Sequence, residues 1–280
     1  MQKLDNQDYA LALPLLSEVK INTLFAGGVL GGQTTGKVYV DSVQNPRTFY
    51  VAHDFGMSLL YGDSGNEDFN RSLSDYMTNK KGNRHSVEWL QADPAGGWEQ
   101  LLESTVTEHN ALLSKADPNL QASDKRRIDI QTRVNFTFDQ EVYHRAKKQG
   151  FRQDAVIVQM TGEGFDEQAG SVIPRYFWRN AEHFRNSGMG YTLLWEGEKA
   201  SSAFSAYRTA DQLEIGIESA AGHRGKGFAF SVCCALIDYC LEHGLEPVWG
   251  CRLENKGSYQ LAQKLGFKPS LNIPYYRLAE

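Results

Sequence analysis

The stretch between residues 213 and 244 joins a strand pattern, a glycine-rich turn and a helix pattern, and it restricts the fold more than any other part of the chain. Residues 213–219, LEIGIES, alternate apolar and polar side chains as a half-buried strand does. Residues 227–243 have the apolar spacing of an amphipathic helix, which Gly244 ends. The turn between them reads Arg224-Gly225-Lys226-Gly227. Because such a turn leaves the first N–H groups of the helix without partners, the stretch predicts a strand–turn–helix unit that suits a phosphate group.

Two common phosphate-binding patterns do not fit this turn. A Walker loop requires Gly, four residues and then Gly-Lys-Ser/Thr, but counting from Gly222 the second glycine is followed by Phe228. A dinucleotide-binding turn requires Gly-x-Gly-x-x-Gly, but counting from Gly225 its last position is Phe230. A third pattern, Arg/Gln-x-x-Gly-x-Gly/Ala, fits residues 224–229.

This third pattern is that of the GCN5-related N-acetyltransferase (GNAT) superfamily, which residues 188–278 resemble. The strand before the turn, the helix after it and PVWGC at 247–251 follow the order of that superfamily. ENKGSYQLAQKLGF at 254–267 is similar to its Asn-x-x-Ala/Ser…Leu-Gly-Phe helix. Within the superfamily, LEIGIES, RGKGFA, CLEHGLEPVWGC and ENKGS together resemble bacterial antibiotic-resistance acetyltransferases of the zwittermicin A type.

The resemblance implies that acetyl-CoA is the co-substrate. Backbone N–H groups of the turn would bind its pyrophosphate, since glycines without a Cβ let the backbone approach closely. Arg224 and Lys226 would add positive charge, and Asn255 would serve both as a helix N-cap and as a coenzyme A contact. The alternative is a solvated basic turn that only starts a core helix. The implied cofactor-binding residues are Ile217, Ser219, Arg224, Gly225, Lys226, Gly227, Phe228, Ala229, Asn255 and Ser258.

The resemblance also implies a general base on the strand before the turn. Glu214 best matches the family position of this carboxylate and shares one strand face with Glu218, while Ile215 and Ile217 occupy the other. An exposed strand carboxylate without a catalytic role is the alternative interpretation of Glu214.

The group that protonates the departing thiolate is harder to assign. The family usually has a tyrosine four residues after the Ala/Ser of its second helix, but that position, four after Ser258, is Ala262. Tyr259 lies three residues earlier, about 60° around the helix. Tyr259 is therefore the candidate acid, and water is the alternative.

The predicted fold class is α/β (α+β), with a GNAT fold and a mixed, mainly antiparallel sheet in residues 151–280. Residues 1–150 have a similar order of elements without a second glycine turn, and they are interpreted as a degenerate GNAT-like domain that shapes the acceptor site. In residues 1–150 we expect helices over 8–25, 66–80, 96–115 and 139–150, and strands over 37–42, 48–54, 57–63, 85–91 and 126–138. In residues 151–280 we expect strands over 154–160, 190–197, 199–209, 212–219, 246–252 and 270–278, a loop over 161–170, and helices over 174–188, 227–243 and 256–265.

Composition restricts the partners. The 280 residues have a net charge of −5 and no basic stripe, which argues against duplex nucleic acid and anionic membranes. No signal peptide and no apolar run of ~18 residues are evident, so a cytoplasmic location is expected. Cys233, Cys234, Cys240 and Cys251 form no CxxC pair and are expected to be buried thiols, and neither they nor the histidines have metal-ligand spacing.

The sequence thus predicts a cytoplasmic, acetyl-CoA-dependent N-acetyltransferase, monomeric or homodimeric and without a metal, that transfers acetyl directly to a small amine or amino-bearing metabolite. Two alternatives stay open. A coenzyme A-binding sensor without turnover is suggested by Ala262. An acyl or aminoacyl transferase of the same fold would use a larger donor such as charged tRNA, which an acidic chain disfavours.

Overall fold

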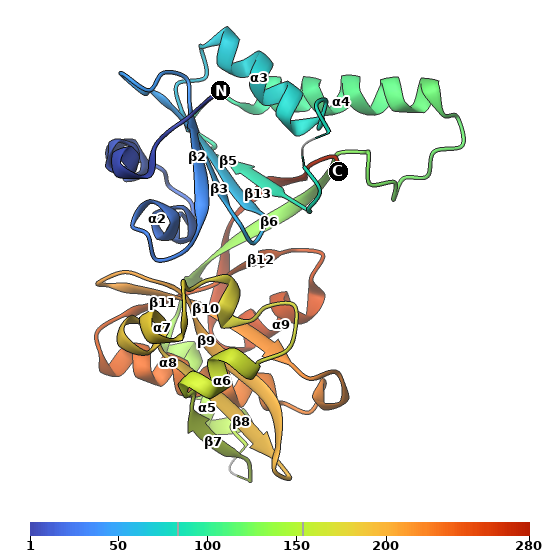
Figure 1. Ribbon diagram of the computed structural model, residues 1–280. Helices are drawn as coiled ribbons and strands as arrows, with labels where there is room; N and C mark the ends of the chain where they lie inside the picture. Colours follow the sequence, from blue (N-terminus) through green and yellow to red (C-terminus); the bar gives the residue numbers. More distant parts are fainter. Residues whose placement is uncertain (83, 153) are drawn as a thin grey trace. The chain divides into compact units, whose positions relative to one another are not determined.

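The computed structural model describes residues 1–82, 84–152 and 154–280, and the chain divides into two compact units (Figure 1). Unit 1 comprises Met1–Arg133 and Ile273–Glu280, and unit 2 comprises Val134–Asn272. These bounds differ from a division at residue 150. The reason is that the helix α5 (Gln140–Gly150) packs within unit 2, where the Tyr143 hydroxyl donates to the Cys234 carbonyl at 3.0 Å.

Unit 1 contains a sheet of order β1-β2-β3-β4-β5-β13-β6 among its described residues. β1 to β4 are antiparallel neighbours, β5 is parallel to β4, and β13 is antiparallel to β5. Figure 1 shows helices on both sides of this sheet. The elements are β1 (Gln2–Lys3), the 3-10 helix η1 (Asn6–Ala12), α1 (Leu13–Leu16), α2 (Leu24–Leu30), β2 (Gly36–Val40), β3 (Thr48–His53), β4 (Met57–Gly62), α3 (Glu67–Met77), β5 (Trp89–Ala92), α4 (Glu99–Ala116) and the unit 1 parts of β6 (Asp129–Phe138) and β13 (Phe267–Arg277).

Unit 2 contains a second sheet of order β11-β10-β9-β8-β7 among its described residues. β7 to β10 are antiparallel neighbours, and β11 is parallel to β10. β12 belongs to the other sheet, next to β6. Besides α5 and the rest of β6 and β13, the elements are β7 (Val156–Gln159), α6 (Gly162–Glu167), η2 (Pro174–Tyr176), α7 (Ala181–Ser187), β8 (Gly190–Trp195), β9 (Glu198–Arg208), β10 (Gln212–Ser219), η3 (Ala221–His223), α8 (Phe228–Glu242), β11 (Glu246–Val248), β12 (Gly250–Arg252) and α9 (Lys256–Lys264).

The two units have one order of elements in common. Each has three antiparallel strands, then a helix, then a strand parallel to the third: β2-β3-β4-α3-β5 in unit 1 and β8-β9-β10-α8-β11 in unit 2. The expected α/β class with mixed, mainly antiparallel sheets is confirmed. In both units the predicted meander was correct, because turn residues such as Gly, Asp, Asn and Pro bound its strands.

The helix expected over residues 8–25 was wrong. The chain forms η1 and the short α1 and then starts a separate helix, α2, at Leu24. Pro14 lies in the first turn of α1, where its missing N–H is tolerated. The Asn22 side chain accepts a hydrogen bond from the Leu24 N–H at 3.0 Å, which favours a turn before α2.

Three expectations in unit 2 were also wrong, and capping residues explain two of them. The expected loop over residues 161–170 contains α6, because the Thr161 side chain caps it at Gly164. The helix expected over 174–188 is divided into η2 and α7, since Asn180 caps α7 at His183. The strand expected over 246–252 is two strands, β11 and β12, which belong to different sheets.

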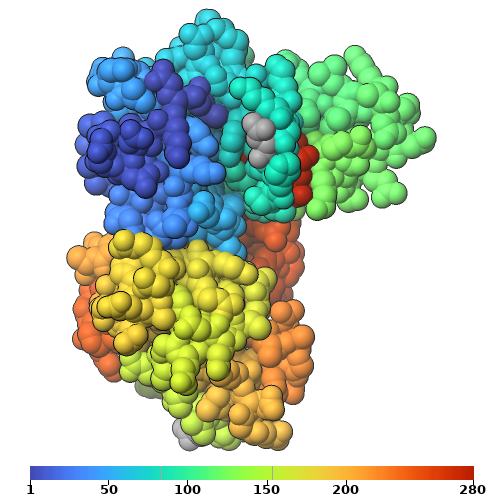
Figure 2. Space-filling model, in the orientation of Figure 1, coloured from blue at the N-terminus to red at the C-terminus, as the bar shows by residue number. Residues whose placement is uncertain are grey.

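Each unit has its own apolar core. In unit 2, residues of α8 such as Val232, Leu236 and Ile237 pack against Leu213 and Ile215 of β10. The four cysteines are free and buried, as expected, and burial raises the pKa of the Cys234 and Cys240 thiols to about 12. In contrast, α4 and the residues that follow it lie at the surface of unit 1 (green in Figure 2), and none of the described helices could cross a bilayer.

Candidate active site

The connection between β10 and α8 is an exposed turn whose backbone requires glycine. After η3 the chain passes through Gly225 at φ 76° and reaches Gly227, the N-cap of α8, at φ 83°. Residues with a Cβ rarely adopt these angles. A Cβ on Gly225 would meet no atom within 4 Å, so the space beside this turn is open.

The first turn of α8 has no side-chain cap, unlike the other α-helices of unit 2 among the described residues. Asp139, Thr161, Asn180 and Asn255 accept hydrogen bonds from the first turns of α5, α6, α7 and α9. At α8 no side chain among the described residues does so, and no acidic residue lies in its first turn. Its N–H groups and the positive end of its dipole are therefore available to an anion. The turn fits the pyrophosphate of coenzyme A on these grounds.

The two basic residues of the turn behave differently. The Arg224 guanidinium is turned back onto the end of β10, where its Nε donates to the Ser219 carbonyl at 3.2 Å and its Nη2 lies 3.5 Å from Glu218 Oε1. Lys226 is exposed and has no ion pair among the described residues. Its ammonium is thus not held by a carboxylate among the described residues.

Arg152 lies beneath the turn, a position that the sequence analysis missed. Its Nη1 donates to the Lys226 carbonyl at 3.2 Å, and its backbone N–H donates to Ser231 Oγ at 2.9 Å. The guanidinium lies 4.8 Å from the Trp195 ring centroid and 5.2 Å from that of Phe228. These contacts fix the turn to β8 and to α8.

The carboxylate of Asp154 completes this cluster. Both of its oxygens accept hydrogen bonds from Arg152, and this contact lowers the pKa of Asp154. No local sequence pattern marks Arg152 as a residue of the turn, because its partners on β8, in the turn and on α8 are distant in sequence.

Glu214 is buried, with 5% of its surface exposed. It pairs in register with Tyr207 of β9 and with Val248 of β11. Leu213, Ile215 and Ile217 pack in the core with α8, so Glu214 points to the other face of the sheet. A β-bulge between β9 and β10 directly follows Glu214.

Glu218 connects β10 to the loop after α6. Its Oε2 accepts hydrogen bonds from the N–H groups of Ser171 and Val172 at 2.8 and 2.9 Å. Gly170 has φ 144°, and a Cβ there would overlap the Glu218 side chain. Glu218 is thus a structural carboxylate that holds residues 170–172 against the strand.

Beyond Glu214, one edge of β10 has no strand paired with it among the described residues. β11 pairs only with Gln212, Leu213 and Glu214, and no described strand pairs with that edge of residues 215–219. Ile217 and Ser219, two of the residues that the resemblance implies bind the cofactor, lie on this part of the strand. The Ser219 N–H already donates to Glu218 Oε1 at 3.3 Å, and its carbonyl accepts from Arg224.

The start of α9 has the predicted cap. Asn255 accepts a hydrogen bond from the Ser258 N–H at 3.2 Å, and Ser258 Oγ accepts one from the buried Trp249 indole at 3.2 Å. Ala262 is fully buried in the unit 2 core. The Tyr259 ring packs against the same core and lies 5.8 Å from that of Phe136.

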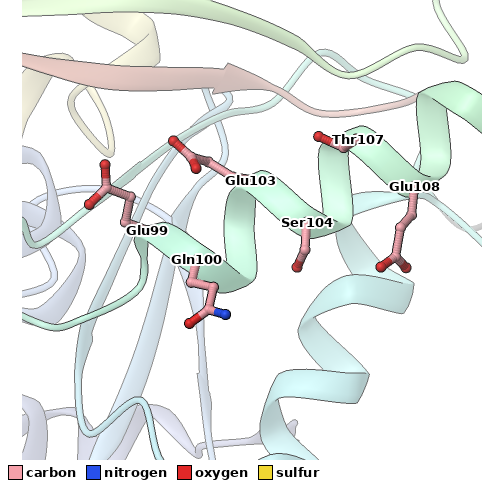
Figure 3. A pocket seen from close by; sticks show the side chains of 6 residues that line it. All are labelled: Glu99, Gln100, Glu103, Ser104, Thr107 and Glu108. Atoms are coloured by element: carbon pink, nitrogen blue, oxygen red, sulfur yellow. The ribbon is translucent and has the colours of Figure 1, made fainter.

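Neither a metal centre nor the hollow along α4 provides another active site among the described residues. No group of three or more His, Cys, Asp or Glu side chains among the described residues could hold a metal ion. A hollow of about 560 Å³ lies along α4, and Figure 3 shows that all its lining side chains come from that one helix. It brings no distant residues together, and its carboxylates Glu99, Glu103 and Glu108 would repel phosphate.

Comparison with known proteins assigns the chain to a family. A sequence model of the GNAT acetyltransferase family matches residues 14–276. The chain belongs to the GNAT acetyltransferase family. The match includes most of unit 1, so it extends well beyond the residues in which the sequence motifs lie.

Several GNAT relatives have similar sequences or folds over their full lengths. The uncharacterized N-acetyltransferase YdfB of Bacillus subtilis (strain 168) is 23% identical over 279 residues, which are 99% of this chain and 98% of that protein. A GCN5-related N-acetyltransferase-like protein from Streptococcus suis 89/1591 has a similar fold, with a TM-score of 0.69, 18% identity, and coverage of 97% and 98%. A tandem GNAT protein from the clavulanic acid biosynthesis pathway has a TM-score of 0.53 and 12% identity, with coverage of 97% and 94%.

Proposed function

We propose that this GNAT protein uses acetyl-CoA to acetylate a small amine or an amino-bearing metabolite directly. The observation that carries the proposal is the uncapped first turn of α8 behind Gly225 and Gly227. The narrower resemblance to zwittermicin A resistance enzymes favours an amino-bearing antibiotic as the acceptor. The net charge of −5 disfavours charged tRNA as a larger donor. The proposed enzyme is cytoplasmic and is a monomer or a homodimer.

The residues of the turn would bind and orient the co-substrate. N–H groups of residues 225–229 would donate to phosphate oxygens, and Lys226 would add a charge-assisted contact. Arg152 would hold the Lys226 carbonyl, so that the turn keeps its shape before binding. The backbone of Ile217 on the open edge of β10 would orient the pantetheine arm, and Asn255 and Ser258 would complete the contacts.

Glu214 would act as the general base. When bound, acetyl-CoA supplies the acetyl group as a thioester, so the N–C bond forms as the C–S bond breaks. The Glu214 carboxylate would accept the proton that the attacking amine loses, and its burial would keep water from competing for that position. Tyr259 is the proposed donor of the proton to the thiolate. Tyr259→Phe should lower kcat by about 10²-fold, whereas an unchanged kcat would assign this proton to water.

Calorimetric titration with acetyl-CoA tests the proposal. Gly227→Glu should abolish binding, because it places a carboxylate and a strained backbone at the phosphate position. Gly244→Glu is the matched control, since Gly244 has φ 68°, also has open space beside it, and follows the other end of α8. Failure of the wild-type protein to bind acetyl-CoA would contradict the proposal.

Turnover distinguishes a transferase from a sensor. Thiol release from acetyl-CoA should appear with at least one member of a panel of amines and aminoglycosides. If the wild type and the Gly244→Glu control bind acetyl-CoA but no amine causes thiol release, the coenzyme A-binding sensor suggested by Ala262 is favoured.

A further inference from the structure

Unit 1 contains a cavity that the proposed acetyl transfer does not use. Its volume is about 490 Å³, within the range of small-molecule sites. Side chains of β2, β3 and α3 and of the segment before β5 line it, and they include Lys37, Tyr39, Tyr76, Arg84 and Glu88.

Glu88 is a buried carboxylate without a cation. Only 7% of its surface is exposed, and its two oxygens accept hydrogen bonds from the hydroxyls of Tyr50 and Tyr76. No Lys, Arg or His nitrogen among the described residues lies within 4.0 Å of it, although buried carboxylates are normally paired. Since a carboxylate has about four acceptor positions, Glu88 can accept further hydrogen bonds. The cavity therefore has an unpaired negative charge in its wall.

Tyrosine rings surround this carboxylate. The ring centroids of Tyr39 and Tyr76 lie 6.0 Å apart, and those of Tyr50 and Tyr76 lie 5.3 Å apart. Burial and the Glu88 charge raise the pKa of Tyr39 and Tyr76, so the phenols stay neutral. Neutral aromatic faces beside a carboxylate attract an ammonium group.

Arg84 provides the opposite charge in the same cavity. The residue is 8% exposed, and its guanidinium donates to the carbonyls of Tyr76, Met77 and Ala279. These three bonds hold it without an ion pair to Glu88. Its Nε is buried without an acceptor among the described residues, and the exposed Lys37 also lines the cavity. A group with free acceptor oxygens would satisfy this donor.

We propose that unit 1 binds a small zwitterion that carries an ammonium group and a carboxylate, such as an α-amino acid. The ammonium lies against Glu88 and the ring of Tyr39, since the Arg84 guanidinium lies over the Tyr76 ring at 4.8 Å from its centroid. The carboxylate accepts from Arg84 Nε and lies near Lys37. This site is independent of the coenzyme A turn, because all its residues belong to unit 1.

Thermal unfolding of the full-length protein with each standard L-α-amino acid tests the proposal, followed by calorimetry with those that raise Tm. At least one should bind, and Glu88→Gln should weaken its binding about tenfold or more, as expected for loss of a buried charge pair. Glu103→Gln, which removes an exposed carboxylate of α4, should leave the affinity unchanged. The proposal is wrong if no amino acid raises Tm, or if Glu88→Gln binds as tightly as the wild type.

A second variant tests the proposal even if Glu88→Gln does not fold. Lys37 is exposed, so Lys37→Gln should fold normally and still weaken binding of the same amino acid. It should not affect the corresponding amine without a carboxylate, and equal effects on both would contradict the assigned orientation. Gly227→Glu should bind the amino acid normally, which separates this site from the acetyl-CoA site.

Discussion

The two units differ in how the helix after their third antiparallel strand begins. In unit 1, Asn66 caps α3 by accepting from the Phe69 N–H at 3.0 Å, and Glu67 and Asp68 occupy the first turn. In unit 2, α8 begins at Gly227 without a cap and without an acidic residue. The same order of elements thus gives one helix start that repels phosphate and one that attracts it. The two units thus differ in how this helix is capped, although the order of their elements is the same.

The largest expected effect comes from replacing Glu214 of β10, which has no acidic counterpart on β4 of unit 1. β4, with the sequence MSLLYG, has no acidic residue, whereas β10 carries Glu214. Glu214→Gln should lower kcat by roughly 10²–10³-fold, because the proposed general base is lost. Steady-state kinetics measures this, and the acetyl-CoA affinity should change little. Glu246→Gln, an exposed carboxylate on the neighbouring β11, is the control, and an unchanged kcat in Glu214→Gln would make Glu214 structural.

The second prediction is that unit 1 is sensitive to acid. Burial lowers the pKa of His53 to about 4, and its Nδ1 accepts from the Phe55 N–H at 2.9 Å. The unfolded chain, with an ordinary pKa near ~6.5, takes up the proton first, so stability present above that pH is lost as the pH falls toward 4. The loss should reach up to ~3 kcal/mol.

Urea unfolding between pH 7 and pH 4.5 measures this loss. His53→Gln should flatten the dependence on pH, and His85→Gln, an exposed histidine of the same unit, should not. An identical pH dependence in wild type and His53→Gln would refute the assignment.

The third prediction concerns the cations beside the two turns. Arg152 binds the turn of unit 2, while Arg47 lies 3.3 Å from Asp63 in the turn of unit 1. Arg152→Met should raise KM for acetyl-CoA about tenfold with kcat unchanged, since it loosens uniform binding of the co-substrate. Arg152→Lys should restore part of the affinity, and Arg47→Met should have no effect. If Arg152→Met keeps its KM, the arginine only supports the fold.

The smallest expected effect is the loss of the unit 1 cap. Asn66→Ala removes the hydrogen bond to Phe69 and should cost about 1 kcal/mol of unfolding free energy. Calorimetry should show Tm lowered by a few degrees, with acetyl-CoA affinity unchanged. A change in that affinity would mean that unit 1 takes part in binding the co-substrate.

Much of this arrangement could be predicted from local patterns. The meanders, the turn at 224–227 and the cap at Asn255 depend on residues close in sequence. The division of residues 8–25 into η1, α1 and the start of α2 could not be predicted. Short helices end where side chains such as Asn22 offer the backbone other partners. Nor could the division of residues 246–252 between two sheets, which depends on distant strands. Arg152 and Glu218 were missed as structural residues of the site for the same reason.

The last strand of the chain has a consequence for how the protein is made. Tyr276, Leu278 and Ala279 are buried in the core of unit 1, although about 140 residues of unit 2 precede them. During synthesis on the ribosome, unit 1 therefore stays incomplete until residues 273–280 emerge, and unit 2 can finish folding first. A chain cut after residue 133 would leave apolar surface of unit 1 uncovered and should depend on chaperones or aggregate.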